Sequence, residues 1–392
     1  MTADPVYLDH AATTPVRSEV LEAMLPFFGA AAFGNPASAH RFGRTARAGV
    51  EEARRKVAAA VGAEPSQVVF TSGGTEADNL AIVGAAQAAR AASRPMHAAV
   101  CATEHKAVLA AAHALTRMGG SETILPVDGA GVLELAALDL ALEAHPAVVS
   151  VMWVNNEVGT LQPVAEIGRR CQAAGVLFHT DAVQAFGQIP VSVGTAGASL
   201  LTISGHKIGA PKGVGALVVR SRAAIEAIIH GGSQQFGLRP GTENVAGAVA
   251  LGRAAELAAA EQGAKAARLG RLRDDLAARI RAAVPDVVWV AEEGPRAPHV
   301  LSVAVPGADA EAMLMHLDLQ GIAASGGSAC NTGAVEPSHV LTAMGVPRAL
   351  ALCTVRFSLG RETTEADIDR AATVFPAVVA KVRKLAGVLG RA

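Results

Sequence analysis

The sequence predicts an α/β protein with a mainly parallel central sheet, helices on both of its faces, and a smaller α+β domain. Two observations support this fold class. Short apolar runs alternate with longer helical patterns through the first part of the chain, and such alternation is typical of βαβ units in a parallel sheet. A long stretch rich in Ala, Leu, Arg and Glu, residues 243–284, then leads to a second group of strand-like and helical patterns.

The first part contains seven strand-like runs, with helical patterns between most of them. A first helix is expected from Ser18, which can serve as its N-cap, to Phe28. The expected strands are 67–71, 98–101, 122–126, 148–153, 176–179, 200–203 and 215–219. The expected helices between them are 44–61, 76–92, 106–118 and 164–174.

The second part predicts a smaller domain. Its expected strands are 287–290, 300–305 and 354–358, and its expected helices are 310–320 and a last one from Thr364. A segment rich in Gly and Ser, 325–333, lies between these elements. We expect a large domain of residues 15–255 and a small domain of residues 1–14 with 256–392.

Composition excludes several classes of protein. The 392 residues are 51% hydrophobic with a net charge of −1, so no basic field for nucleic acid or an anionic membrane is present. No basic segment leads into an apolar one at the N-terminus, and charges or glycines interrupt the apolar stretches. The four cysteines are far apart and form no CxxC pair, which argues against a zinc site or a disulfide framework. A cytoplasmic protein is expected.

Lys207 is the central candidate for chemistry. It follows Ser204-Gly-His between two apolar strand-like runs. Removal from water lowers the pKa of a lysine, and a neutral amine can form a Schiff base with a carbonyl compound. The alternative is an ordinary lysine in a surface loop.

A second candidate is the sequence Thr71-Ser-Gly-Gly-Thr-Glu, which follows a strand and opens a helix. Backbone N–H groups at a helix N-terminus, with nearby hydroxyls, can hold a phosphate. The Gly-Lys-Ser/Thr of a Walker A loop is missing. The alternative is a glycine turn with a threonine cap.

Polar residues follow several other strands at the same expected edge of the sheet, where ligands bind in such folds. Asp181 either caps the next helix or pairs with a cationic ring nitrogen, as an aspartate does in pyridoxal phosphate enzymes. Gln184 lies three residues later. Asn156 and His105 follow two further strands; each is either structural or a ligand contact.

In the second part, Cys330 lies among small residues in Ser325-Gly-Gly-Ser-Ala-Cys-Asn-Thr-Gly, unlike Cys101, Cys171 and Cys353, which have core-like surroundings. It is either an accessible, reactive thiol or a loop cysteine without a role. Arg356 lies in a strand-like run and either binds a carboxylate or forms a structural salt bridge.

Taken together, these segments resemble the cysteine desulfurases of the NifS/IscS type, which belong to the class V aminotransferase family of fold type I pyridoxal phosphate enzymes. The resemblance covers essentially the whole chain, and the order of so many motifs makes it specific. They are Tyr7-Leu-Asp-His-Ala-Ala-Thr-Thr-Pro, Gly34-Asn-Pro-Ala-Ser, Phe70-Thr-Ser-Gly-Gly-Thr-Glu-Ala-Asp-Asn, Thr103-Glu-His-Lys-Ala-Val, Val154-Asn-Asn-Glu-Val-Gly, Ser204-Gly-His-Lys, Arg239-Pro-Gly-Thr-Glu, Gly327-Ser-Ala-Cys and Arg356-Phe-Ser-Leu-Gly-Arg.

The resemblance implies a role for each candidate. Lys207 would hold pyridoxal phosphate as a Schiff base and later move protons. Asp181 would pair with the ring nitrogen, Gln184 with the ring hydroxyl, and His105 would stack on the ring as a catalytic residue. The phosphate would be held by Gly74, Thr75, Ser204, His206 and, from a partner subunit, Thr242.

The resemblance also implies the reaction. L-cysteine would be converted to L-alanine, with Asn156 contacting both cofactor and substrate, Arg356 binding the substrate carboxylate, and Cys330 accepting the sulfur as a persulfide. A sulfur-acceptor protein would receive it for iron–sulfur cluster assembly or other thiolation. No stable metal site is implied, only a transient iron–sulfur contact at Cys330, and the protein would be a homodimer.

Two other functions are compatible with the same fold. One is selenocysteine lyase or another class V reaction. The other is a binding protein that keeps the fold without the chemistry, against which Lys207, Asp181 and Cys330 argue.

Overall fold

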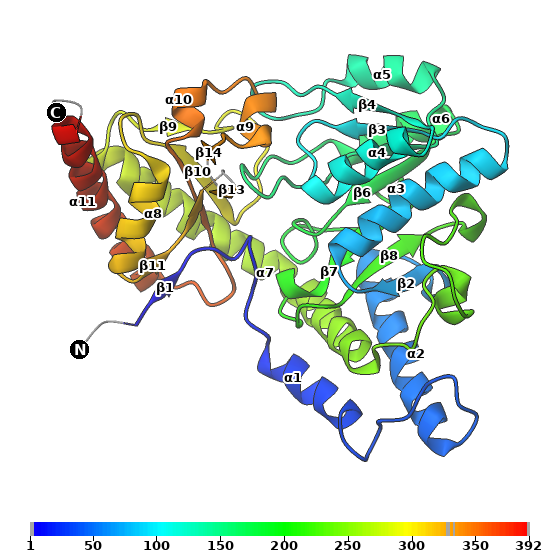
Figure 1. Ribbon diagram of the computed structural model, residues 1–392. Helices are drawn as coiled ribbons and strands as arrows, with labels where there is room; N and C mark the ends of the chain where they lie inside the picture. Colours follow the sequence, from blue (N-terminus) through cyan, green and yellow to red (C-terminus); the bar gives the residue numbers. More distant parts are fainter. Residues whose placement is uncertain (1–3, 327–329, 332–333, 390–392) are drawn as a thin grey trace.

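The computed structural model describes residues 4–326, 330–331 and 334–389. A seven-stranded sheet forms the centre of one part of the molecule (Figure 1). Its strands, in spatial order, are β2 (Val68–Thr71), β8 (Gly215–Val219), β7 (Leu200–Ser204), β6 (Leu177–Asp181), β5 (Val148–Ser150), β3 (His97–Cys101) and β4 (Ser121–Leu125). The strands from β7 to β4 pair in parallel, and β8 runs antiparallel to both of its neighbours.

Helices cover both faces of this sheet, which is why most of its strands are buried at nearly every position. One face packs on α3 (Gly74–Ala91) and α4 (Lys106–Arg117). The other packs on α2 (Arg41–Val61), α5 (Leu135–Glu143), α6 (Val164–Ala173) and the first half of α7 (Val245–Ala283). The predicted α/β fold class is confirmed.

A second, antiparallel sheet has the order β12 (Ser325–Gly326), β15 (Thr354–Ser358), β10 (Val300–Ala304) and β9 (Val288–Trp289). It packs on α8 (Ala310–Leu319), α11 (Glu365–Leu389) and the second half of α7. The rings of Phe357 and Phe375 meet edge to face in this core, with centroids 5.4 Å apart. The N-terminal strand β1 (Val6–Tyr7) joins this part by pairing with β11 (Ile322–Ala323).

Helix α7 contributes to both cores: Ala250 and Leu251 are buried in one, and Leu269 and Leu276 in the other. The boundary that we propose between residues 255 and 256 therefore falls inside an unbroken helix. The remaining elements are α1 (Ser18–Met24), α9 (His339–Ala343), α10 (Arg348–Ala351), β13 (Cys330–Asn331), β14 (Ala334–Val335) and five 3₁₀ helices, η1 (Leu25–Phe27), η2 (Pro65–Gln67), η3 (Gly205–Lys207), η4 (Arg222–Ala224) and η5 (Gln234–Gly237). No helix among the described residues is both long and apolar enough to cross a bilayer.

The structure corrects several local expectations. Ser18 does not cap α1: the N-cap is Arg17, and the Ser18 hydroxyl instead donates to Glu19. Gly73 rather than Thr75 is the N-cap of α3. The strand expected over 148–153 ends at Ser150. All three differences lie at the ends of elements, where boundaries are the least precise part of a sequence-based assignment.

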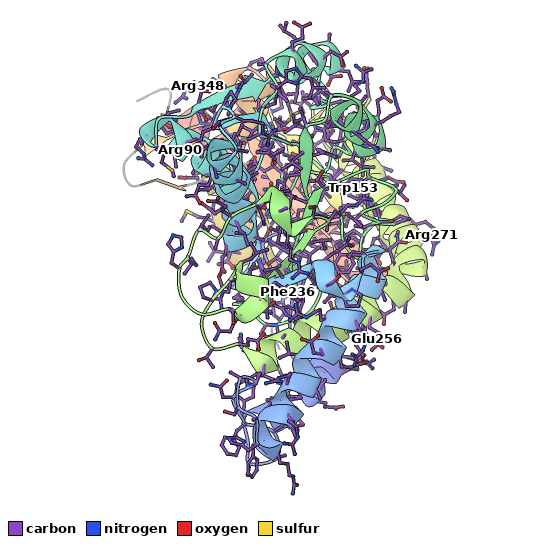
Figure 2. All side chains as sticks on the ribbon, turned by 90° about the vertical axis from the view of Figure 1, so that its right-hand side faces the viewer. Arg90, Trp153, Phe236, Glu256, Arg271 and Arg348 are labelled. Carbon is purple, nitrogen blue, oxygen red and sulfur yellow. The ribbon has the colours of Figure 1, made fainter. Side chains whose placement is uncertain are left out.

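Arg54 of α2 ties this helix to the edge of the large sheet. Its guanidinium is buried, donates to the carbonyl of Val68 and to Oε1 of Gln235, and lies 5.1 Å and 4.9 Å from the ring centroids of Phe70 and Phe236. Phe236 is labelled where its loop meets α2 in Figure 2. Gln235 adopts a left-handed backbone with φ of 46°, so side-chain bonds offset a strained conformation.

We expect Arg54→Ala to lower the free energy of unfolding by about 2 to 4 kcal/mol, because it leaves buried acceptors without a donor. Urea unfolding followed by circular dichroism measures this change. Arg55→Ala is the matched control: Arg55 is exposed and, among the described residues, pairs only with Glu52, so a change below about 0.5 kcal/mol is expected. Equal effects of the two substitutions would contradict the assigned role of Arg54.

Candidate functional site

A cavity of about 440 Å³ lies where the parallel strands of the large sheet end. It is the place where an open α/β sheet offers side chains from several strands to one ligand. The predicted site residues brought together in its lining are Gly74, Thr75, His105, Asn156, Asp181, Gln184, Ser204, His206, Lys207 and Arg356. Thr242 is not in this lining, and the side chain of Cys330 lies outside the described part of the structure.

Lys207 enters the cavity from η3, directly after β7. Its amine donates to the carbonyls of Ala11 and Ala12, at 2.5 Å and 2.8 Å. Burial lowers the pKa of this amine to about 8, and the nearby Arg356 guanidinium acts in the same direction. A substantial fraction of the amine is therefore neutral near pH 7 to 8 and able to act as a nucleophile or base.

Asp181 is the last residue of β6 and is 5% exposed. Its carboxylate accepts a hydrogen bond from the Val183 N–H at 2.8 Å, and no regular helix follows, so the helix-cap interpretation is wrong. Burial raises the pKa of Asp181, whereas the nearby His105 and Lys207 lower it. A cation in the cavity would be favoured next to this carboxylate. Gln184 lies beside it and donates to the Ala11 carbonyl at 2.8 Å.

The opposite end of the cavity is suited to an anion. The first turn of α3, with Gly74 and Thr75, directs unpaired backbone N–H groups toward it. A Cβ on Gly74 would lie 3.2 Å from Cγ2 of Val183, so glycine lets the helix end approach the strand edge closely. Burial, with Lys207 and Lys212 nearby, lowers the pKa of His206 to about 4. The His206 ring is therefore neutral and, with Ser204, offers uncharged polar contacts.

Glu76 fixes the turn that precedes this helix end. Its Oε2 accepts from the Ser72 N–H at 2.8 Å, and its Oε1 accepts from Nε of Arg239 at 2.8 Å. Arg239 belongs to the same loop as Thr242, which is exposed and does not line this cavity. The loop therefore supports the cavity through Arg239.

Arg356 reaches the cavity from β15 of the second sheet. Its guanidinium donates to the Asn156 carbonyl at 2.8 Å and to Oδ1 of Asp9 at 2.7 Å. Its buried Nε has no hydrogen-bond partner among the described residues. A guanidinium fixed in this way is suited to a carboxylate ligand.

The four cysteines differ in setting. Burial raises the pKa of Cys101 and of Cys171 to about 12, and burial also raises the pKa of Cys353. These thiols therefore remain protonated and unreactive near neutral pH. Cys330 lies in β13, whose backbone pairs with β14, while its side chain lies outside the described part of the structure.

The structure also brings residues to the cavity that the sequence analysis did not single out. Asp78 of α3 and Met152 line it, and the Ala11 carbonyl orders both Lys207 and Gln184. Glu104 is fully buried nearby and accepts from the Met152 N–H at 2.5 Å. Asp78 could have been noticed as a carboxylate in the first turns of an Ala-rich helix, but the other contacts join segments far apart in sequence.

Comparison with known proteins assigns the family. The model of the aminotransferase class-V family matches residues 6–371. Cysteine desulfurase IscS of Dictyoglomus turgidum is 44% identical over 380 residues, covering 97% of this chain and 96% of the relative. Cysteine desulfurase NifS of Azotobacter vinelandii is 44% identical over 383 residues, covering 97% and 94%.

Solved structures agree with this assignment. A NifS-like protein superposes with a TM-score of 0.87 at 34% identity, covering 98% of this chain and all of that one. A NifS-like protein from Rickettsia africae gives a TM-score of 0.85 at 31% identity, covering 96% and 99%. With these matches and a cavity lined by the expected motifs, the chain belongs to the class-V aminotransferase family and, within it, to the cysteine desulfurases of the IscS/NifS type.

Proposed function

We propose that this enzyme uses pyridoxal phosphate to convert L-cysteine to L-alanine and passes the sulfur to Cys330 as a persulfide. The observation that carries the proposal is the convergence of Lys207, Asp181 and Arg356 on one cavity. An amine with a lowered pKa, a buried carboxylate and a fixed guanidinium are the groups that an amino-acid reaction of this class needs.

The residues present fit pyridoxal phosphate. The first turn of α3, with Ser204 and His206, would hold the phosphate, and Asp181 would hold the ring nitrogen in its protonated form. His105 lines the same cavity and would cover one face of the ring, and Gln184 would contact the ring hydroxyl. Asp78 supports the fit, because its buried Oδ1 has no hydrogen-bond partner among the described residues.

When bound, pyridoxal phosphate supplies an electron sink that allows the substrate Cα to lose its proton. Lys207 is the residue suited to take this proton at Nζ and to return it, since its pKa of about 8 lies near the working pH. Arg356 and Asn156 would orient the substrate through its carboxylate. The Ala11 and Ala12 carbonyls direct Nζ while it is unattached.

For the sulfur transfer we propose Cys330 as the nucleophile. Its thiolate attacks the substrate Sγ, the Cβ–Sγ bond breaks, and the electron pair of that bond stays with Cβ, which takes up a proton and becomes the methyl group of alanine. The transferred sulfur remains on Cys330 as a persulfide. A sulfur-acceptor protein would then receive it, for iron–sulfur cluster assembly or another thiolation.

The enzyme is proposed to act as a homodimer in the cytoplasm. Several large apolar side chains are exposed from α1 to the start of α2, and exposed apolar patches often mark protein–protein interfaces. They are Leu21, Leu25, Phe28, Phe33 and Phe42. A second copy would cover them, and Thr242, which is exposed and does not line its own cavity, would contact the phosphate bound by the partner subunit. The free thiols of Cys101, Cys171 and Cys353 suit a reducing compartment.

We expect Lys207→Ala to abolish turnover and the covalent attachment of pyridoxal phosphate, since no other lysine among the described residues lines this cavity. Borohydride reduction of the wild-type holoenzyme, followed by peptide mass spectrometry, should find the pyridoxyl group on Lys207. Lys212→Ala is the control, because it removes a neighbouring lysine that lies outside the lining. Label on another lysine would refute the assignment.

Cys330→Ser should bind pyridoxal phosphate with the wild-type absorbance but yield no persulfide from L-cysteine, because the cofactor contacts come from other residues. Cyanide-labile sulfur on the protein is the measurement, together with alanine formation. Cys101→Ala, Cys171→Ala and Cys353→Ala should retain sulfur transfer, since burial keeps those thiols protonated. A wild-type level of persulfide in Cys330→Ser would move the search to another cysteine, and no sulfur release from L-cysteine by the wild type would refute the reaction itself.

Light scattering should give twice the chain mass of 39.7 kDa. Phe28→Glu combined with Phe33→Glu should weaken the dimer, because it places charges in the apolar surface that the second copy would cover. Leu140→Glu is the control: Leu140 of α5 is 68% exposed, similar to the 66% of Phe28, but lies elsewhere. A wild-type monomer with full activity would contradict the dimer proposal.

A further inference from the structure

After the segment that contains Cys330, the chain again contacts the part of the molecule built on the seven-stranded sheet (the large-sheet part), beginning at Ser338. Ser338 is the buried N-cap of α9, and its hydroxyl oxygen accepts from the Val340 N–H at 3.0 Å. The same hydroxyl donates to Oε2 of Glu157. Ser338 therefore uses both its donor and an acceptor position, and its donor bond goes to a residue of the large-sheet part.

Glu157 is held firmly by its own turn. Oδ1 of Asn155 accepts from the N–H groups of Glu157 and Val158 at 2.8 Å and 3.0 Å, and Nδ2 of Asn155 donates to the Thr103 carbonyl at 3.0 Å. Gly159 closes the turn with φ of 78°, and a Cβ there would lie 2.9 Å from Cβ of Val300. The turn thus presents the Glu157 side chain in a fixed position.

The contacts of Glu157 and of the residue after Ser338 lie next to two residues of the candidate site, Asn156 and His105. Asn156 is the adjacent residue, and its carbonyl accepts from Arg356 at 2.8 Å. A second bond supports the same junction: Nε2 of His339 lies 2.9 Å from the Glu104 carbonyl, one residue before His105. The chain after Cys330 is therefore bonded to the immediate neighbours of two cavity residues.

The other end of the segment is fixed to the site as well. Ser325 pairs with Arg356, and Gly326 with Val355, in the β12–β15 ladder. Residues on both sides of the Cys330 segment thus connect to groups around the substrate end of the cavity. On the N-terminal side the connection is backbone pairing. On the C-terminal side, α9 packs its apolar residues into the large-sheet core, and the polar connections are one side-chain bond from Ser338 and one from His339.

We propose that Glu157 is a positioning residue for sulfur transfer, which anchors the C-terminal end of the Cys330 segment beside the substrate site through its bond to Ser338. This inference rests on the proposed function. Glu157 contacts neither the phosphate end nor the ring-nitrogen end of the cavity and is absent from the lining, so its effect is separate from cofactor binding. Its carboxylate can be replaced by an amide oxygen, because the Ser338 hydroxyl needs only an acceptor.

The test compares Glu157→Ala and Glu157→Gln in the holoenzyme. Single-turnover mixing with L-cysteine, with cyanide-labile sulfur as the readout, should show persulfide formation slowed about tenfold to a hundredfold in Glu157→Ala, as expected for loss of a buried hydrogen bond that positions a reacting group. Glu157→Gln should stay within about threefold of wild type. The cofactor absorbance and the KM for L-cysteine should be unchanged in both variants.

Two further variants make the test specific. Ser338→Ala should reproduce the defect, and the double variant Glu157→Ala with Ser338→Ala should be no slower than Ser338→Ala alone, because both changes remove the same bond. Glu166→Ala is the control, since Glu166 only forms surface ion pairs with Arg169 and Arg170 in α6; its persulfide rate should equal that of wild type.

The outcomes distinguish failure of the positioning role of Glu157 from failure of the proposed function. If wild type forms persulfide and Glu157→Ala forms it equally fast, the positioning role is overturned while the proposed function stands. The positioning role is also overturned if a loss of bound cofactor or of folded protein accounts for the slower persulfide formation in Glu157→Ala. It is overturned as well if Glu157→Gln is as slow as Glu157→Ala. If wild type forms no persulfide at all, the proposed function fails and this inference falls with it.

Discussion

The site depends on the passage of residues 9–14 between the two sheets. In this short segment the Ala11 carbonyl accepts from both Lys207 and Gln184, and Asp9 pairs with Arg356. The Thr14 hydroxyl donates to the His206 carbonyl at 2.8 Å. Because β1 anchors the chain in the second part and these bonds anchor it in the first, one segment orients groups from both sides of the cavity.

Burial strengthens the electrostatic interactions among the charged groups of the site. Lys207 and Asp181 are largely buried, so neighbouring charges act strongly on them: Arg356 lowers and Asp181 raises the pKa of Lys207, and Lys207 lowers the pKa of Asp181. The same burial that raises the pKa of Cys101 and Cys171 keeps the core thiols unreactive. Lys207, by contrast, faces the cavity, where the Ala11 and Ala12 carbonyls hold its amine.

The fold and most of the cavity lining could be predicted from sequence, because strand–helix alternation and motifs at strand ends are local patterns. The ends of elements were less predictable: Arg17, not Ser18, caps α1, and β5 stops at Ser150. Contacts such as Arg356 with Asp9 or Ser338 with Glu157 join residues far apart in the chain. Neither periodicity nor spacing encodes such pairs, and for Asp78 and Glu104 the pattern showed only a polar residue near a helix or strand end.

The continuous helix α7 limits how the two parts can move. With 39 residues and a rise of about 1.5 Å per residue, it forms a rod of about 58 Å whose two halves are buried in different cores. Bending this rod, or twisting one half against the other, would break backbone hydrogen bonds or core packing. The helix therefore acts as a stiff spacer that sets how far apart the two sheets lie, and with them Lys207 of the first part and Arg356 of the second.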